Sequence, residues 1–300
     1  MRVQPFEPAY LPGLRALVNN HLQAVVPGWA MPDGAVAAHL NENYGEFVTD
    51  PWVTDRATLL VSEGWEVLAA AHLLRYGDGE GVGRHFRGAG EIAWLLCAPG
   101  RPEAASAVLS EARETLASWG VRREEVCSGG LPVPALGGVP DCWPHVAEAL
   151  LAAGYTPGPE HREALYGGTL VGVREPGAPP LRGLELRRGA GRFGVRFSAV
   201  ADGGEKLGHL ECAADLTEGG HLPALGGWAD LAELWVREGS RSRGVGGWLV
   251  EHAAGWLRMA GCDRVVVPVD GNDEAAGAGR FYRRFGWEVL ARLARSWESG

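Results

Sequence analysis

The sequence predicts an α/β protein made of two similar units in tandem, and three observations support this fold class. The chain has 300 residues, about twice the length of an ordinary domain. It is 46% hydrophobic and 22% charged, so it has enough apolar residues for a buried core. A strand–loop–helix pattern also occurs twice, because aligning Leu96 with Val236 also aligns Arg101 with Arg241 and Leu109 with Leu249.

The first unit alternates helical and strand patterns. Its predicted elements are helices at residues 9–26 and 33–47, a hairpin over 58–76, a strand at 92–97, a helix at 105–119 and a weak strand at 163–170. The last helix shows apolar residues at spacings of three and four, which predicts one buried face. Gly120 directly after it is a typical helix end.

A linker is predicted at residues 175–180, which read Glu-Pro-Gly-Ala-Pro-Pro. Prolines stiffen such a segment and exclude a helix from it. We therefore predict one domain over residues 1–175 and a second over residues 176–300.

The second unit repeats the pattern with strands first. Its predicted elements are strands at residues 183–188, 194–201, 206–214, 231–236 and 265–269, with a helix at 245–260 before the last strand. The first two strands are joined only by the short turn at residues 189–193. The helix has one apolar stripe, and Gly261 follows it as the expected end.

Charge and composition narrow the class of function. The net charge of −9 argues against nucleic acid or an anionic membrane as the main partner, since both attract cationic surfaces. Five scattered cysteines and nine histidines without HxxxH or HxH spacing predict reduced thiols and no metal site. No apolar run approaches the ~20 residues of a membrane helix, and the N-terminus lacks a signal pattern. We expect a cytoplasmic protein, and the scarcity of lysine beside many arginines and glycines is typical of a GC-rich bacterial genome.

The segment with the clearest chemistry is Arg241-Ser-Arg-Gly-Val-Gly-Gly247, between a predicted strand and a predicted helix. Such a turn exposes backbone N–H groups at the positive end of the helix dipole, where an anion binds. Gly244 and Gly246 allow a phosphate to approach where a Cβ would clash, and Arg241 and Arg243 can add charge-assisted hydrogen bonds. A Rossmann interpretation fails because the third glycine of its fingerprint would fall on Leu249.

The segment resembles the pyrophosphate loop Q/R-x-x-G-x-G/A of the GNAT superfamily of N-acetyltransferases. Phe281-Tyr-Arg-Arg-Phe-Gly-Trp287 is similar to the family's F-Y-x-x-x-G-F signature, and the motifs cover about residues 229–288. The resemblance implies, for each unit, a mixed and mostly antiparallel central sheet flanked by helices. It also implies acetyl-CoA as the cofactor and Tyr282 as the general acid that protonates the leaving thiolate, or as a hydrogen bond to the sulfur. The cofactor-binding residues that it implies are Trp235, Val236, Arg241, Ser242, Arg243, Gly244, Val245, Gly246, Gly247, Asn272 and Phe281.

The general base is not fixed by the resemblance. An amine acceptor has a pKa near 10.4 and is protonated at neutral pH, so a base is needed. Glu233 lies on the strand before the glycine-rich loop, Glu211 on the preceding strand, and Asp230 is a third candidate. Asn272 is displaced by three residues from the family's position, which Ala275 occupies, so it either contacts pantetheine or caps a helix.

The first unit has lost these features. Its corresponding loop reads Arg101-Pro-Glu-Ala-Ala-Ser106, without glycines, and Leu150 occupies the position of the tyrosine. We therefore predict a degenerate, non-catalytic first unit and a catalytic second unit. The predicted function is direct transfer of an acetyl group to a primary amine of a small molecule or peptide. A mycothiol-synthase-like enzyme and a non-catalytic acyl-CoA-binding module are the alternatives.

Overall fold

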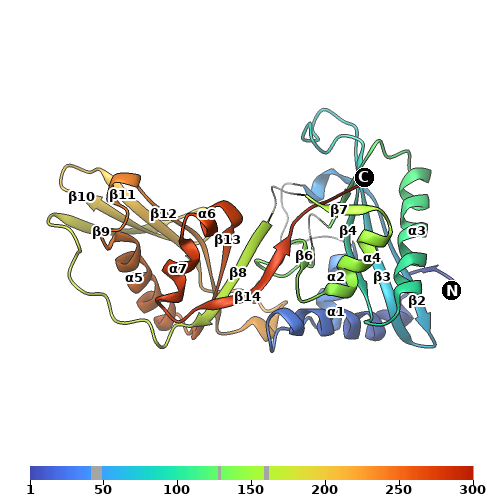
Figure 1. The fold of residues 1–300 in the computed structure, drawn as a ribbon, viewed down its shortest axis with the longest axis horizontal. Coiled ribbons are helices and arrows are strands. Elements are labelled where there is room, and N and C mark those ends of the chain that lie inside the picture. Colours follow the sequence, from blue (N-terminus) through green and yellow to red (C-terminus); the bar gives the residue numbers. More distant parts are fainter. Residues whose placement is uncertain (42–48, 128–129, 159–161, 300) are drawn as a thin grey trace. The chain divides into compact units, whose positions relative to one another are not determined.

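The structure, a computed structural model, describes residues 1–41, 49–127, 130–158 and 162–299. The chain forms two compact units, each built on one mixed sheet with helices packed against it (Figure 1). Unit 1 comprises residues 1–163 and 291–300, and unit 2 comprises residues 164–290. The predicted fold class, two α/β units in tandem with mostly antiparallel sheets, is confirmed.

Unit 1 contains a seven-stranded sheet in the order β1-β2-β3-β4-β5-β15-β7. Its strands are β1 (Gln4–Pro5), β2 (Val53–Glu63), β3 (Glu66–Tyr76), β4 (Ala89–Cys97), β5 (Arg123–Val126), β7 (Tyr155–Pro157) and β15 (Trp297–Ser299). Its helices are α1 (Leu11–Val25), α2 (Asp33–Asn41), α3 (Pro102–Ser118) and α4 (Pro144–Ala152). Among the pairs recorded for this sheet, only β4 and β5 run parallel.

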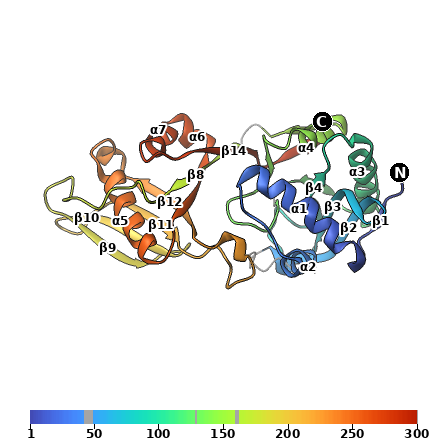
Figure 2. The ribbon, with the colours of Figure 1, turned by 90° about the horizontal axis from the view of Figure 1, so that it is seen from below.

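Helices α2 and α3 cover opposite faces of this sheet (Figure 2). Gly90 on β4 lies under α3, because a Cβ there would meet Leu116 at 2.9 Å. Trp94 on the same strand faces the other way and donates a hydrogen bond to His39 on α2 at 3.0 Å. The helix predicted at residues 33–47 begins at Asp33 as expected, and residues 42–48 of that prediction lie outside the described residues.

Unit 2 is built on the eight-stranded sheet β6-β14-β8-β13-β12-β11-β10-β9. The strands of unit 2 are β8 (Arg162–Thr169), β9 (Leu184–Ala190), β10 (Val195–Ala201), β11 (Lys206–Ala213), β12 (Trp228–Val236) and β13 (Arg264–Asp270). Strand β14 (Glu288–Ala294) begins in unit 2 and ends in unit 1, where it pairs with β6 (Val139–Pro140). The helices of unit 2 are α5 (Val245–Met259), α6 (Gly271–Ala275) and α7 (Ala278–Arg283). The strands β9 to β12 are antiparallel neighbours, whereas β12 and β13 are parallel.

The predicted helix of the second unit is confirmed as α5. Its apolar stripe is buried and packs against β10, β11 and β12, with Trp248 and Leu249 in the core. Gly261 follows the helix with a left-handed φ of 89°, a conformation that favours glycine. As predicted, only a short turn joins β9 to β10.

Two strands belong to a different sheet from the one that their order in the chain predicts. Strand β8 lies in the sheet of unit 2, between β13 and β14, although the linker at residues 175–180 follows it. Strand β15, at the end of the chain, lies in the sheet of unit 1 between β5 and β7. The chain therefore passes between the units at residues 163 and 164, instead of 175 and 176, and again at residues 290 and 291, because strand pairing outweighs the composition of the linker. None of the described helices is long and apolar enough to cross a membrane.

Candidate active site

The parallel strands β12 and β13 separate part of the way along their length. They pair from Trp228 and Arg264 to Asp230 and Val266, and no further pair joins them within unit 2, although β12 continues to Val236 and β13 to Asp270. Pro268, which has no N–H to donate, lies in the separated part of β13. The edge of β12 is thus open to a ligand in this gap.

The open edge of β12 presents backbone N–H groups. Arg237 N–H donates to the Leu207 carbonyl on the β11 side at 2.9 Å. Successive residues of a strand direct their N–H groups to opposite neighbours, so the N–H of Val236 points to the β13 side. That side has no β13 partner beyond Asp230. A carbonyl oxygen in the gap therefore finds a preorganised donor at Val236.

An anion site follows β12 at the start of α5. The connecting residues include two left-handed positions, Ser242 (φ 58°) and Gly244 (φ 88°). Gly244 is the N-cap residue of α5, with no side-chain cap and no acidic residue in the first turn. The first N–H groups of the helix therefore lack an intramolecular side-chain partner, and the helix dipole favours an anion there.

One open pocket of about 1240 Å³ joins the gap and the helix start, entirely within unit 2. Ten of the predicted site residues line it: Glu233, Trp235, Val236, Arg241, Ser242, Gly244, Gly246, Gly247, Phe281 and Tyr282. Four do not: Glu211, Arg243, Val245 and Asn272. The pocket is larger than a typical small-molecule site, which suits a long ligand such as coenzyme A.

Several predicted residues prove to have other contacts. Arg241 donates through Nε to the Val236 carbonyl at 3.1 Å, which fixes its guanidinium at the end of β12. Val245 is buried in the core, and Arg243 is exposed outside the pocket lining. Asn272 is exposed, and its N–H donates to Asp270 Oδ1 at 2.8 Å, so that Asp270 is the N-cap of α6.

Tyr282 reaches the pocket from α7 and is otherwise buried, with 6% of its surface exposed. Its ring stacks on Trp287 at 5.9 Å and packs against Tyr166 of β8 at 5.8 Å. Burial raises the pKa of the Tyr282 hydroxyl above its ordinary value, and the nearby Asp273 adds to this. The hydroxyl therefore keeps its proton at neutral pH. Among the described residues no group is recorded as a hydrogen-bond partner of this hydroxyl.

Glu233 lies beside a histidine that the sequence analysis did not identify. His209 on β11 is 8% exposed, and its Nε2 lies 3.1 Å from Glu233 Oε2, whereas the Glu233 side chain is 44% exposed. The two residues share one face of the sheet because β11 and β12 are in register. Trp235 packs against the His209 ring at 5.6 Å on the same face. The sequence contained no spacing that would reveal this pair, since the residues come from separate strands.

Glu211 is positioned differently from Glu233. It is fully buried and accepts hydrogen bonds from Arg196 and from the backbone N–H of Phe193. Burial alone would raise its pKa, but these hydrogen bonds and the Arg196 charge outweigh it and hold the pKa below its ordinary value. A carboxylate with a lowered pKa and no access to the pocket is a poor general base, so the structure assigns Glu211 to the Arg196 ion pair.

His209, Glu211 and Glu233 form a candidate cation site, which is empty. Ligand atoms of His209, Glu211 and Glu233 all lie within 4.8 Å of one another. A cation there would compete with the Arg196 guanidinium for Glu211. Three further arginines line the pocket: Arg174 and Arg280, which lie outside the motifs, and Arg284, at a variable position of the Phe281–Trp287 signature.

Comparisons with known proteins agree with this geometry. Residues 161–287 match the sequence model of the Acetyltransferase (GNAT) family. A tandem GNAT protein from the clavulanic acid biosynthesis pathway has a similar fold, with a TM-score of 0.62, 15% identity and coverage of 100% of this chain and 98% of that one. A GCN5-related N-acetyltransferase from Sphaerobacter thermophilus gives a TM-score of 0.61 at 16% identity, covering 97% and 93% of the two chains. No curated protein sequence matches the chain.

The separated strands and the uncapped helix start therefore belong to a fold that serves acyl-CoA-dependent N-acetyl transfer. Residues 161–287 thus match the GNAT family, and the chain as a whole has the fold of a tandem GNAT protein. The resemblance inferred from the loop at residues 241–246 and the Phe281–Trp287 signature is confirmed at this level.

Proposed function

We propose that unit 2 transfers the acetyl group of acetyl-CoA directly to a primary amine of a small molecule or peptide. The observation that carries this proposal is that one pocket joins the open edge of β12, the uncapped start of α5, Tyr282 and Glu233. Acetyl-CoA, when bound, supplies an activated acyl carbonyl. The residues present fit it, because the first turn of α5 offers free N–H groups and a Cβ on Gly247 would meet nothing within 4 Å.

Glu233 is the general base in this proposal. An acceptor amine arrives protonated and must lose a proton before it can attack a carbonyl. The Glu233 carboxylate is partly exposed in the pocket, where an amine can reach it. His209 Nε2 lies 3.1 Å from one oxygen of this carboxylate and positions it. Glu233 thus faces the acceptor, with His209 behind it.

Tyr282 is the proton donor to the leaving thiolate of coenzyme A. Its hydroxyl stays protonated at neutral pH because burial raises its pKa. Its ring is held on two sides by Tyr166 and Trp287, so the hydroxyl is kept in one place at the pocket wall. The N–H of Val236, on the open strand edge, supplies electrostatic stabilisation of the oxyanion-hole kind to a carbonyl oxygen.

Unit 1 is non-catalytic in this proposal. Only four residues separate β4 from α3, and α3 begins with Pro102 instead of a glycine-rich turn. Arg101, the counterpart of Arg241, has its guanidinium paired with both oxygens of Glu63 at 3.1 and 3.2 Å. We therefore expect one acetyl-CoA site per chain.

The test is release of free thiol from acetyl-CoA in the presence of a panel of amines, amino acids, aminoglycosides and peptide N-termini. Turnover with one class of acceptor, together with one acetyl-CoA per chain by calorimetry, is the expected result. Binding without turnover on any acceptor would favour an acyl-CoA-binding module. Two equivalent sites would contradict the role given to unit 1. For the base, Glu233→Gln is expected to shift the acidic limb of the pH–rate profile.

A further inference from the structure

The segment that follows β8 packs along α5. We call residues 170–180 the α5 strap. At the C-terminal end of the helix, Arg258 donates to the carbonyls of Leu170 and Val173 at 2.9 Å each. At the N-terminal end, Trp248 Nε1 donates to the Gly177 carbonyl at 3.2 Å. The strap therefore runs antiparallel to α5, from its last turn toward the helix start that lines the pocket.

One strap residue brings a cation into the pocket. Arg174 is 83% exposed at its side chain, and its Nε donates to Oε1 of Glu251, whose side chain is 4% exposed. A buried carboxylate needs a partner, so Glu251 holds this guanidinium firmly at the pocket wall. Arg174 lines the pocket, and within the described residues neither of its two terminal nitrogens has a recorded partner.

The position of Arg174 beside α5 indicates the kind of group that Arg174 binds. Glu251 lies four residues after Gly247 and on the same face of the helix, so it is about 6 Å further along the axis. Both residues line the same pocket. The pocket thus offers two anion-binding points one helical turn apart, the N–H groups at the start of α5 and the guanidinium of Arg174.

We propose that Arg174, positioned by Glu251, binds the 3′-phosphate of coenzyme A, so that unit 2 distinguishes coenzyme A from its 3′-dephospho form. The inference rests on the proposed function, in which the start of α5 takes the pyrophosphate. Coenzyme A carries a second phosphate on its ribose, separated from the pyrophosphate by that one sugar. A terminal guanidinium edge is suited to bidentate recognition of a phosphate.

Besides Arg241, whose Nε is bonded to the Val236 carbonyl, two other arginines line the pocket: Arg280 on α7 and Arg284 directly after it. Both are exposed, and no buried carboxylate among the described residues is recorded as a partner of either. Their side chains must lose conformational freedom to bind a phosphate, whereas Arg174 is already held in place. The structure therefore favours Arg174 as the residue that gives the preference for coenzyme A over its 3′-dephospho form.

The test compares coenzyme A with 3′-dephospho-coenzyme A by calorimetry on the full chain. The wild type is expected to bind coenzyme A more tightly. Arg174→Gln should weaken coenzyme A binding on the order of ten- to hundredfold, as for loss of a charged hydrogen bond, and leave 3′-dephospho-coenzyme A unchanged. Glu251→Gln should reduce the same preference with Arg174 still present.

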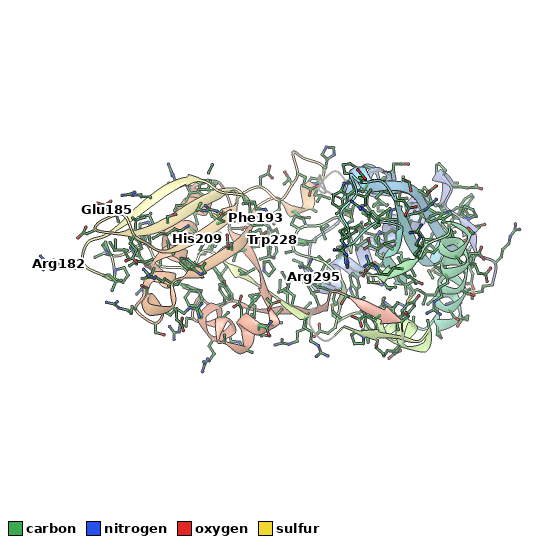
Figure 3. All side chains as sticks on the ribbon, turned by 90° about the horizontal axis from the view of Figure 1, so that it is seen from above. Arg182, Glu185, Phe193, His209, Trp228 and Arg295 are labelled. Atoms are coloured by element: carbon green, nitrogen blue, oxygen red, sulfur yellow. The ribbon has the colours of Figure 1, made fainter. Side chains whose placement is uncertain are left out.

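Matched controls are Arg284→Gln, which removes another cation of the pocket, and Arg182→Gln. Arg182 projects from the outer edge of unit 2, away from His209 (Figure 3). Both controls should keep the preference. The inference is overturned if Arg174→Gln weakens the binding of both ligands equally, weakens the binding of neither, or only lowers the melting temperature. The inference is also overturned if Arg284→Gln, instead of Arg174→Gln, loses the preference for coenzyme A. If the wild type binds neither ligand, the proposed function itself fails.

Discussion

Acid should destabilise unit 1 through its buried histidines. His39 on α2 accepts the indole N–H of Trp94 at Nε2, and its Nδ1 is buried without a partner. Burial lowers the pKa of His39 to about 4, with Arg56 adding to the effect and Asp50 opposing it. His21 on α1 is similar, since burial lowers its pKa to about 4 as well. Both imidazoles are therefore neutral in the folded unit at neutral pH.

The size of the effect follows from the difference between folded and unfolded pKa values. The unfolded chain binds protons at these histidines below pH 6.5, whereas the folded unit does not until about pH 4. Stability is thus full above pH 6.5 and is lost as the pH falls from 6.5 toward 4. Between pH 7 and pH 5 each histidine removes about 2 kcal/mol, so the two together remove about 4 kcal/mol. This is a large share of the 5–15 kcal/mol of a typical domain.

The measurement is urea unfolding at pH 7 and pH 5, followed by hydrogen exchange of peptides from β3 for unit 1 and from β13 for unit 2. The variant His39→Gln keeps an acceptor for Trp94 but does not titrate. Its β3 stability should fall by about 2 kcal/mol less than that of the wild type between the two pH values. His85→Gln, at an exposed histidine, is the control and should behave as the wild type. Equal losses in His39→Gln and wild type would refute the argument.

Three further changes test the site. Tyr282→Phe should lower kcat by about 10²–10⁴ with little change in acetyl-CoA affinity, because the hydroxyl donates a proton; an unchanged kcat would make Tyr282 a packing residue only. Glu211→Gln should cost about 3 kcal/mol in urea unfolding, because it breaks a buried ion pair, and should leave the acidic limb of the pH–rate profile in place; a shifted limb would make Glu211 the base. Gly244→Val should abolish acetyl-CoA binding as measured by calorimetry, because residue 244 has a φ of 88° and a Cβ there meets Pro180 at 3.0 Å. Retained affinity would show that this turn is not the phosphate site.

Local patterns predicted most of the elements. The apolar stripe of α5, the glycine that ends it and the hairpin strands β2 and β3 are encoded by residues near each other in the chain. The glycine-rich loop was also predictable, because a strand, a turn and a helix start follow one another directly. Ten predicted site residues line the pocket for this reason, since they belong to that loop, to the strand before it or to the Phe281–Trp287 signature.

What could not be predicted depends on pairing between distant strands. His209 meets Glu233 only because β11 and β12 pair in the register that places His209 opposite Trp235. Glu211 appeared equivalent to Glu233 in the sequence, but its contact with Arg196 comes from β10 and removes it from the candidates for the base. Composition around residues 175–180 indicated a linker, whereas the same residues form most of a strap that binds α5.

The strand exchange has a direct consequence for the candidate site. Strand β8 precedes the linker, yet it supplies Tyr166, whose ring packs against Tyr282 and whose hydroxyl donates to Glu274 on α6 at 2.8 Å. Tyr166 is fully buried, so the Tyr282 ring is supported by a residue that the linker-based boundary would place in the other domain. The strap that begins at the end of β8 then carries Arg174 to the pocket. Both the proposed proton donor and the proposed phosphate contact therefore depend on residues 162–174, a segment outside the family's loop and signature motifs.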